Sequence, residues 1–356
     1  GVLAPLQQRA WLAALQGLHD DGLRVAQGRI DQLASVARNV GLDVLAKEYG
    51  LKPKVVGIVD SHGAALDEDG LDLRTVLASK KETGTLAGLG DPYHEGMDGV
   101  HAIRETGCEV VVETTPTELK KGEPGLTHVK TAMIKGRHVV CTNKGPLAIA
   151  MPALMELAHH NGVVFKFSGT VGGGTPVLDF AKKCLEGSEI RSIRGILNGT
   201  SNYILTRMSS EGATMDAALA DAQRLGYAEA DPTYDIEGFD TACKLVITSN
   251  YVLGTALSIK DVEVRGITKV TGADISEAAA DGETIKLIGS VGSKAKVSPE
   301  RVKLTHPLNV SGTFNAICFD TYPSGEVTLV GKGAGGPETA TSVVRDLIEI
   351  RRSFAR

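Results

Sequence analysis

The sequence predicts an α/β fold with a doubly wound parallel sheet, followed by a second domain of α+β type. Short β-branched runs alternate with helical stretches from about residue 50 to 160, and the pattern coarsens into longer helices and scattered strands beyond that point. A chain of 356 residues is long enough for about two domains. We therefore expect residues 1–160, rejoined by about 325–356, to form the first domain and residues 161–324 the second.

Three segments of the first domain have strand length, are rich in β-branched residues and are bounded by turn residues. The predicted strands are 54–60, 109–113 and 137–142, and the predicted crossover helices between them are 71–79, 96–106 and 125–135. Ligands of such sheets bind at the carboxyl ends of the strands. Thr114-Thr115-Pro116 and Asn143-Lys144 follow two of these ends. Thr114, Thr115 and Lys144 are therefore candidate ligand-binding residues.

The second domain is predicted with strands at 163–167, 190–197, 301–304 and 313–320 and helices at 200–210, 214–225 and 238–254. A last strand at 326–330 and a helix at 334–351 are expected to return to the first domain.

Composition excludes several classes of protein. The formal charge is −5 without a lysine or arginine run, which excludes a nucleic-acid-binding footprint. No apolar stretch approaches the ~18 residues of a membrane span, and the first residues lack a signal-peptide pattern, so we expect a cytoplasmic protein. The five cysteines are odd in number, far apart and without a CxxC pair, which argues against a disulfide framework or a zinc ribbon.

A dinucleotide-binding domain is expected to open with a strand and the loop G-x-G-x-x-G, whose N–H groups hold the pyrophosphate. The chain starts without either, so residues 3–15 are interpreted as the helix after such a loop, and 20–45 as an additional helical stretch. A formal match occurs at Gly331, Gly333 and Gly336, but too few residues follow for a βαβ unit. We expect a tight turn there, bringing the last helix beside the cofactor.

Asp60 ends a predicted strand, where a carboxylate usually binds the adenosine ribose and disfavours a 2′-phosphate. This position favours NAD over NADP. A helix cap or a turn aspartate is the alternative interpretation.

Charged residues converge in the segment 226–245, GYAEADPTYDIEGFDTACKL. Asp240 and Lys244 lie four apart on a predicted helix, hence on one face, and the residues beside them are partly apolar. Asp235 and Glu229 add carboxylates, so the site suits a ligand with an ammonium group. A surface ion pair is the alternative for Asp240 and Lys244.

This segment, together with TNKGPLA at 142–148, SGTVGGGTPVL at 168–178, GILNGTSNYIL at 195–205, VVETTPT at 111–117 and GKGAGGPETA at 331–340, resembles homoserine dehydrogenase. The resemblance runs from about Lys54 to the end of the chain. It implies a Rossmann-like first domain, a second domain for substrate binding and dimerisation, and an enzyme of the short form without an appended regulatory domain.

The resemblance also implies the reaction. L-Homoserine and L-aspartate 4-semialdehyde are interconverted with NAD or NADP, a step of threonine, methionine and isoleucine biosynthesis. Lys244 and Lys144 would flank the reacting oxygen, with Lys244 transferring the proton, while Asp240 and Glu229 would hold the amino end. The other implied substrate-binding residues are Asp235, Tyr227, Gly199 and Thr200.

Cofactor binding is implied for Asp60, Lys144, Thr114, Thr115, Gly335 and Thr339. The family further implies a sodium ion on the backbone carbonyls of Val171, Gly173 and Thr175, although Ser168 stands where its acidic ligand would be. A homodimer formed through edge strands of the second domain is also implied.

Two other functions stay open at this point. An aldehyde dehydrogenase acting on aspartate semialdehyde would need a cysteine nucleophile with a histidine base, and no cysteine here lies in a glycine-rich turn with such a partner. A catalytically silent relative that binds an amino acid would account for the absent glycine loop.

Overall fold

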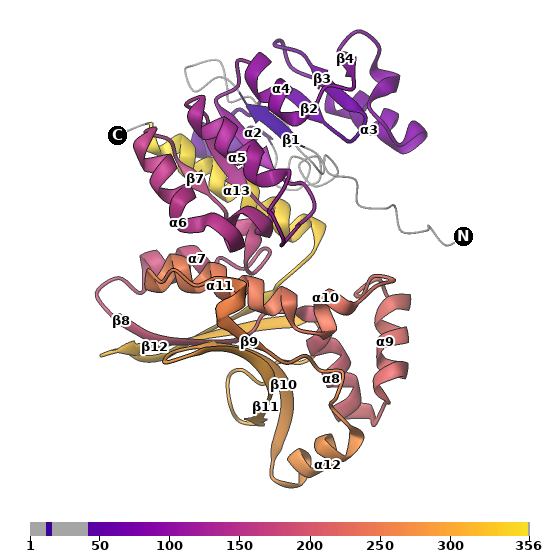
Figure 1. Cartoon of the computed structure of the whole chain (residues 1–356), viewed down its shortest axis with the longest axis vertical. Coiled ribbons are helices and arrows are strands. Elements are labelled where there is room, and N and C mark those ends of the chain that lie inside the picture. Colours follow the sequence, from indigo (N-terminus) through magenta and orange to yellow (C-terminus); the bar gives the residue numbers. More distant parts are fainter. Residues whose placement is uncertain (1–11, 16–41, 355–356) are drawn as a thin grey trace. The chain divides into compact units, whose positions relative to one another are not determined.

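The computed structural model describes residues 12–15 and 42–354. The chain divides into two compact units, the first formed by residues up to Thr170 and from Thr339 onward, the second by Val171–Glu338 (Figure 1). No helix in the described part of the chain is long and apolar enough to cross a membrane.

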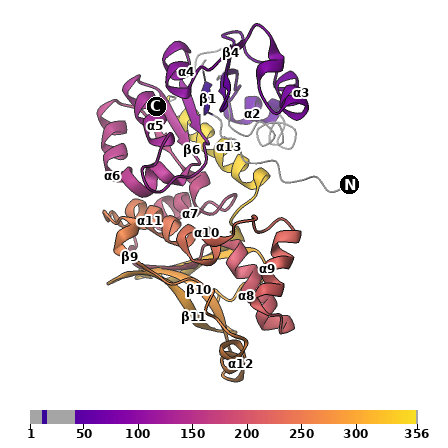
Figure 2. The same ribbon diagram turned by 45° about the vertical axis from the view of Figure 1, so that its right-hand side comes forward.

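The first unit is drawn in indigo to magenta in Figure 2, with its last helix in yellow. It contains a seven-stranded sheet with the order β4-β3-β2-β1-β5-β6-β7. Strands β5, β6 and β7 are parallel, whereas β1 lies antiparallel between β2 and β5, and β3 and β4 extend the sheet as antiparallel strands. The bounds are β1 Leu12–Leu15, β2 Val55–Val59, β3 Gly63–Leu66, β4 Tyr93–Glu95, β5 Val110–Glu113, β6 His138–Cys141 and β7 Phe165–Lys166.

The predicted helix 3–15 is wrong over Leu12–Leu15, which form β1, and the sheet is not wholly parallel. Periodicity alone cannot distinguish a short apolar run in a strand from one in a helix, so the sequence LAAL did not indicate which of the two it forms. Residues 3–11, and 20–41 of the proposed additional helical stretch, lie outside the described residues. Its end falls within helix α2, Leu42–Tyr49.

All three predicted crossover helices form beside this sheet. They are α3 Leu73–Thr83, α4 Gly99–Glu105 and α5 Gly125–Ile134, and they are joined by α6 Lys144–His160 and by α13 Gly336–Ser353, whose residues from Thr339 onward belong to this unit. Val110, Val111 and Val112 of β5 are fully buried, as expected of a strand covered on both faces.

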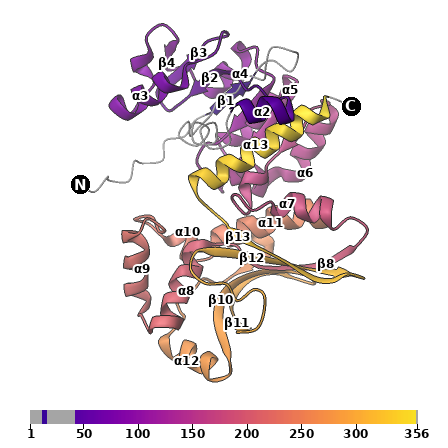
Figure 3. The same cartoon turned by 180° about the vertical axis from the view of Figure 1, so that it is seen from behind.

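The second unit contains a six-stranded sheet with the order β13-β12-β8-β10-β11-β9, in which only β9 and β11 pair in parallel (Figure 3). The bounds are β8 Glu189–Ile196, β9 Val262–Val264, β10 Glu283–Val291, β11 Ala295–Lys303, β12 Phe314–Tyr322 and β13 Gly325–Lys332.

Two predicted strands belong to the other unit. The segment 163–167 contains β7, which pairs with β6 in the first sheet, and the segment 326–330 lies in β13, which pairs with β12 in the second. Each strand follows its nearest partner: β13 continues from β12 through a short hairpin, which is a more local pairing than a return to the first sheet.

The helices of the second unit include α11, Phe239–Leu253, which packs on β8 and β10 of the sheet. Every residue of α11 from Asp240 to Asn250 is buried, as for a helix inside a core. The other helices are α7 Val177–Asp179, α8 Gly199–Glu211, α9 Met215–Arg224, α10 Thr233–Ile236 and α12 Gly272–Ala280.

Strand β10 carries a buried lysine that sequence analysis did not find. Lys286 is 2% exposed, and its ammonium group donates to Asn202 Oδ1 at 3.0 Å, Val310 O at 2.8 Å and Thr206 Oγ1 at 3.4 Å, all of them neutral groups. Burial lowers the pKa of Lys286 to about 8 from an ordinary value of ~10.4.

This shift predicts a pH dependence of stability. Between about pH 8 and pH 10.4 the unfolded chain binds a proton at Lys286 that the folded chain does not, so stability rises with pH over this window. The contribution is complete above the unfolded pKa and is lost as the pH falls through about 8. Urea unfolding of the wild type should show the free energy of unfolding rise by up to about 3 kcal/mol over this pH window, and Lys286→Met should lack this rise. The same dependence of the unfolding free energy on pH in both proteins would contradict the prediction.

Candidate active site

A buried ion pair on α11 is the centre of the candidate site in the second unit. Lys244 Nζ lies 2.7 Å from Asp240 Oδ2, and the side chains are only 8% and 7% exposed. The four-residue spacing places them on adjacent turns of one helix face. Their burial rules out the alternative of a surface ion pair.

The end of β8 completes the surroundings of this pair. Lys244 Nζ also donates to Leu197 O at 2.7 Å. The next residue, Asn198, donates from Nδ2 to Asp235 Oδ1 at 2.6 Å and to Asp240 Oδ2 at 2.9 Å. Its Oδ1 accepts from Ser201 N at 2.8 Å and so caps α8. Asn198 therefore connects the helices α8, α10 and α11 through its side-chain amide.

The electrostatics of this cluster favour a cationic ligand. Burial, and then the nearby charge of Asp240, raise the pKa of Asp235. The charges of Asp235 and Asp240 interact unfavourably, so an additional ammonium group would relieve their repulsion. A substrate with an amino group fits this charge pattern.

The other predicted substrate residues lie on α8 and on the segment before α10. Thr200 Oγ1 donates to Tyr227 O at 2.7 Å, and the ring of Tyr227 lies edge-on to Tyr203 at 5.0 Å. Glu229 is exposed, and its backbone carbonyl accepts from Gln223 Nε2 at 3.1 Å. Thr200 thus anchors the exposed segment that carries Tyr227 and Glu229.

Gly199 is required by packing at the first turn of α8. A Cβ atom there would lie 2.8 Å from Thr313 O. The structure thus gives Gly199 a packing role, while its role in substrate binding stays a prediction.

In the first unit, Asp60 follows β2 and is 7% exposed. Its carboxylate accepts from His62 N at 2.8 Å, from Gly63 N at 3.2 Å and from Lys80 Nζ at 2.6 Å. Because Lys80 neutralises it, Asp60 does not present an isolated negative charge to a ribose 2′-phosphate. The geometry is compatible with NAD and with NADP.

Thr114, Thr115 and Lys144 lie at the carboxyl ends of β5 and β6. Thr115 is 6% exposed and Thr114 is half-buried, while Lys144 is the first residue of α6, directly after its cap Asn143. Sequence analysis missed Lys80, and it placed Asn143 at the strand end beside Lys144 without identifying it as the buried cap of α6. An asparagine between a strand and a glycine-containing helix start is the signal that could have shown the cap.

Gly335 and Thr339 are separated by the division of the chain. Gly335 belongs to the second unit and has a φ of 133°, which favours glycine. Thr339 belongs to the first, where its methyl group would lie 3.4 Å from a Cβ placed on Gly169. Their role in cofactor binding stays a prediction.

The glycines of the formal G-x-G-x-x-G motif have a packing role in the second unit. A Cβ on Gly331 would lie 2.1 Å from Thr175 Oγ1, and one on Gly333 would lie 1.8 Å from Asn315 Nδ2. Both glycines therefore allow close approach of distant side chains.

The proposed sodium ligands form a turn through Gly172 and Gly173, which have φ values of 87° and 56°. The Thr175 carbonyl accepts from Val177 N at 2.8 Å, and Ser168 N donates to Asp346 Oδ2 at 3.0 Å. Among the described residues no group of three or more His, Cys, Asp or Glu could hold a metal. With one carbonyl engaged and no acid at position 168, the fit to sodium is poor, and we assign no step to it.

A thiol nucleophile is not supported at the carboxyl ends of the strands in the first sheet. Cys141 ends β6 and is fully buried, donates to Asn143 O at 3.2 Å, and has its pKa raised by burial and by the charge of Glu113. A buried thiol held neutral is a poor nucleophile. This argues against a semialdehyde dehydrogenase that acts through Cys141.

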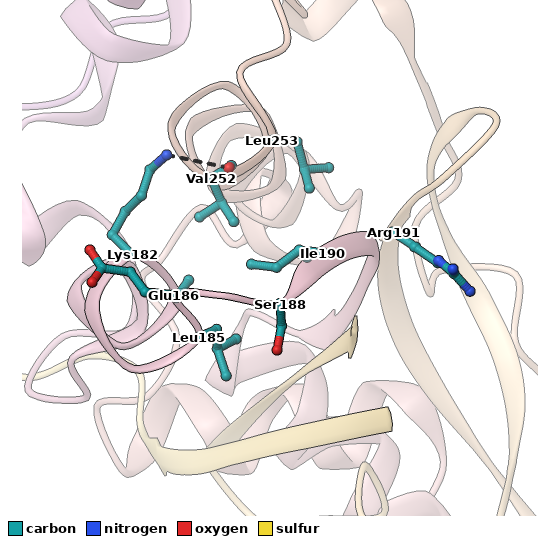
Figure 4. Close-up of a pocket in the computed structure, with 9 residues that line it drawn as sticks. Lys182, Leu185, Glu186, Ser188, Ile190, Arg191, Val252 and Leu253 are labelled. Atoms are coloured by element: carbon teal, nitrogen blue, oxygen red, sulfur yellow. Dashed lines mark hydrogen bonds between the residues drawn. The ribbon is translucent and has the colours of Figure 1, made fainter. Parts of the chain in front are cut away.

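A surface pocket of about 380 Å³ lies elsewhere in the second unit (Figure 4). Its lysine, Lys182, reaches the carbonyl of Val252 near the end of α11 at 3.4 Å. None of the predicted site residues lines it; its lining residues are Ala181, Lys182, Leu185, Glu186, Ser188, Ile190, Arg191, Val252 and Leu253.

Comparisons with known proteins agree on one family. The family model described as homoserine dehydrogenase matches residues 176–348. A homoserine dehydrogenase of Methanocaldococcus jannaschii is 46% identical over 87% of this chain and 92% of its own length. An NAD(+)-dependent homoserine dehydrogenase of Pseudomonas canavaninivorans is 39% identical over 87% and 90%. The solved structure of a hyperthermophilic archaeal homoserine dehydrogenase in complex with NADPH aligns with a TM-score of 0.76 and 30% identity, covering 88% of this chain and 93% of that one.

Proposed function

The chain belongs to the homoserine dehydrogenase family, and from this premise we propose that it interconverts L-homoserine and L-aspartate 4-semialdehyde with NAD or NADP. The buried cluster of Lys244, Asp240, Asn198 and Asp235 is the observation that carries this proposal. The cluster contains carboxyl groups that can bind the ammonium group of the substrate and a lysine that can exchange a proton with its reacting oxygen.

The cofactor fits the carboxyl edge of the first sheet. Asp60 follows the end of β2, Thr114 and Thr115 follow β5, and Lys144 follows β6, at the edge where open α/β sheets bind ligands. Lys80 reaches Asp60 from helix α3. When bound, the nicotinamide ring exchanges the hydride with C4 of the substrate.

The residues of the second unit do the binding and the proton transfer in this proposal. Asp240 and Asp235 bind the amino end of homoserine, an end to which the sequence also assigns Glu229. Asn198 keeps the carboxyl groups of Asp240 and Asp235 in place. In the direction of reduction, the Lys244 ammonium group donates a proton to the oxygen as it gains negative charge. In the direction of oxidation, the same nitrogen accepts the hydroxyl proton. Lys144 is the second lysine assigned to the reacting oxygen.

The purified protein is expected to reduce NAD or NADP in the presence of homoserine, measured by absorbance of the reduced nicotinamide. It should oxidise homoserine much faster than other short hydroxy acids, because only an amino acid matches the two carboxyl groups. A protein that binds homoserine without turnover would be the catalytically silent relative. Equal rates with unrelated hydroxy acids would remove the substrate assignment.

We also propose a homodimer in the cytoplasm. Strands β13 and β9 are the edges of the second sheet and could pair with a second copy. The molar mass measured by light scattering distinguishes one chain from two.

A further inference from the structure

A chain of buried hydrogen bonds starts at Glu113, the last residue of β5. Its carboxylate is 0% exposed, and Oε1 accepts from Thr115 N at 2.6 Å and from the Thr115 hydroxyl. Oε2 accepts from Nδ1 of His128, on helix α5, at 2.8 Å. His128 is itself only 7% exposed. Donors from a loop and from a helix thus fix this carboxylate on both of its oxygens.

Asn143 extends the chain to helix α6. Its Nδ2 donates to Thr115 Oγ1 at 2.9 Å and to Pro116 O at 3.3 Å, and its Oδ1 accepts from Gly145 N at 2.9 Å. The amide therefore connects the loop after β5 to the first turn of α6, which begins at Lys144.

The space around Asn143 is closed. A Cβ on Gly125 would lie 2.5 Å from Asn143 Nδ2, and one on Gly145 would lie 3.2 Å from Asn143 Oδ1. The Asn143 amide therefore fits between the helices α5 and α6 only because both positions are glycine. A small shift of the carboxylate would be transmitted along the chain, because tightly packed groups move together.

The direction of the hydrogen bonds at Thr115 follows from Asn143. The Asn143 amide nitrogen can only donate, so Thr115 Oγ1 accepts from it and donates its own hydroxyl proton to Glu113 Oε1. In the tautomer that carries its proton on Nδ1, His128 donates to Oε2 of the same carboxylate. Replacing the carboxylate by an amide would reverse one of these directions.

We infer that Glu113 and His128 are positioning residues for the dehydrogenase reaction, holding Thr115 and the start of α6 where the nicotinamide end of the cofactor binds. The inference rests on the proposed function. Neither residue contacts the reacting atoms in this assignment; each acts through Thr115 and Asn143, at the carboxyl ends of two parallel strands.

The test compares two substitutions of His128. Asparagine carries its amide nitrogen where histidine carries Nδ1 and can still donate to Glu113, so His128→Asn should retain kcat and the KM for the dinucleotide within about threefold. Leucine cannot donate, so His128→Leu should lower kcat on the order of 10²-fold, the effect of a displacement of about 1 Å at a reacting group. It should also raise the KM for the dinucleotide, whereas the KM for homoserine, set by the second unit, should change little.

His138 provides the matched control in the same sheet. It lies at the start of β6, the opposite end of the strand from Asn143, where its Nδ1 accepts from Val164 N at 2.9 Å. His138→Leu should reduce the urea midpoint as His128→Leu does, with wild-type kcat and KM. If His128→Leu lowers the urea midpoint but keeps the wild-type kcat and KM for the dinucleotide, the inference is overturned.

Two further measurements separate the outcomes. Glu113→Gln keeps the side-chain shape and replaces His128→Leu where the latter does not fold; a kcat within threefold of wild type would overturn the inference. A wild-type protein inactive on homoserine would refute the proposed function instead. Calorimetric affinity for the dinucleotide then still tests the positioning role, because equal affinities of His128→Asn and His128→Leu would reject it.

Discussion

Lys244→Ala is expected to lower kcat by about 10²- to 10⁴-fold while leaving the affinity for the dinucleotide unchanged. This is the range for loss of a general acid or base. Lys244 Nζ has two hydrogen-bond acceptors among the described residues, Asp240 Oδ2 and Leu197 O. An ammonium group carries three donors, so one can address the oxygen of the substrate. Steady-state kinetics in both directions provides the measurement.

Lys286→Met is the matched control for Lys244. Both lysines are buried in the second unit, at 6% and 2% exposure, but the groups that bind Lys286 within the described part of the chain are all neutral. Loss of Lys286 should change stability and leave kcat near the wild-type value. Wild-type turnover from Lys244→Ala, with a stability change like that of Lys286→Met, would reduce Lys244 to a structural residue.

Asp240→Asn is expected to raise the KM for homoserine by roughly 10- to 10²-fold, equivalent to a charge-assisted hydrogen bond of about 1.5–3 kcal/mol. The amino end of the substrate loses its charged partner, while the reacting oxygen keeps Lys244. The substitution also leaves Lys244 without its counter-ion, and breaking a buried pair costs about 3–5 kcal/mol of stability. Kinetics and urea unfolding on the same preparation separate the two effects.

Asp221 offers the control for charge alone. It forms ion pairs with Arg207 and Arg224 on the α8–α9 surface, where solvent screens such pairs and they contribute little to stability. Asp221→Asn should leave the KM for homoserine unchanged. An equal KM increase in Asp221→Asn and Asp240→Asn would show that general charge, rather than contact with the substrate, governs binding.

Local patterns were sufficient for much of the fold and for the central ion pair. The β-branched runs 109–113 and 137–142 contain β5 and β6, because a strand buried on both faces needs a continuous apolar run. The adjacency of Asp240 and Lys244 follows from the 3.6-residue period of a helix. Both features depend only on residues close in the chain.

Other features depend on residues that are distant in the chain. Asn198 reaches Asp235 across 37 positions and Asp240 across 42, so no spacing rule connects them. His128 and Glu113 meet because α5 returns to the end of β5. In each case the role of a polar side chain could not be predicted from its own position, because its hydrogen-bond partner is brought next to it only by the folding of the chain.

Strand order and burial are likewise properties of the folded chain. Strand β10 escaped prediction, and its Lys286 is buried because Asn202 and Val310, from a helix and a loop, satisfy its ammonium group. The glycines at 331 and 333 match a nucleotide motif in sequence, yet Thr175 and Asn315 approach them at distances that leave no room for a side chain. A sequence motif shows only which residues are present. The folded chain determines which neighbours surround them, and the free energy of burying a side chain depends on those neighbours.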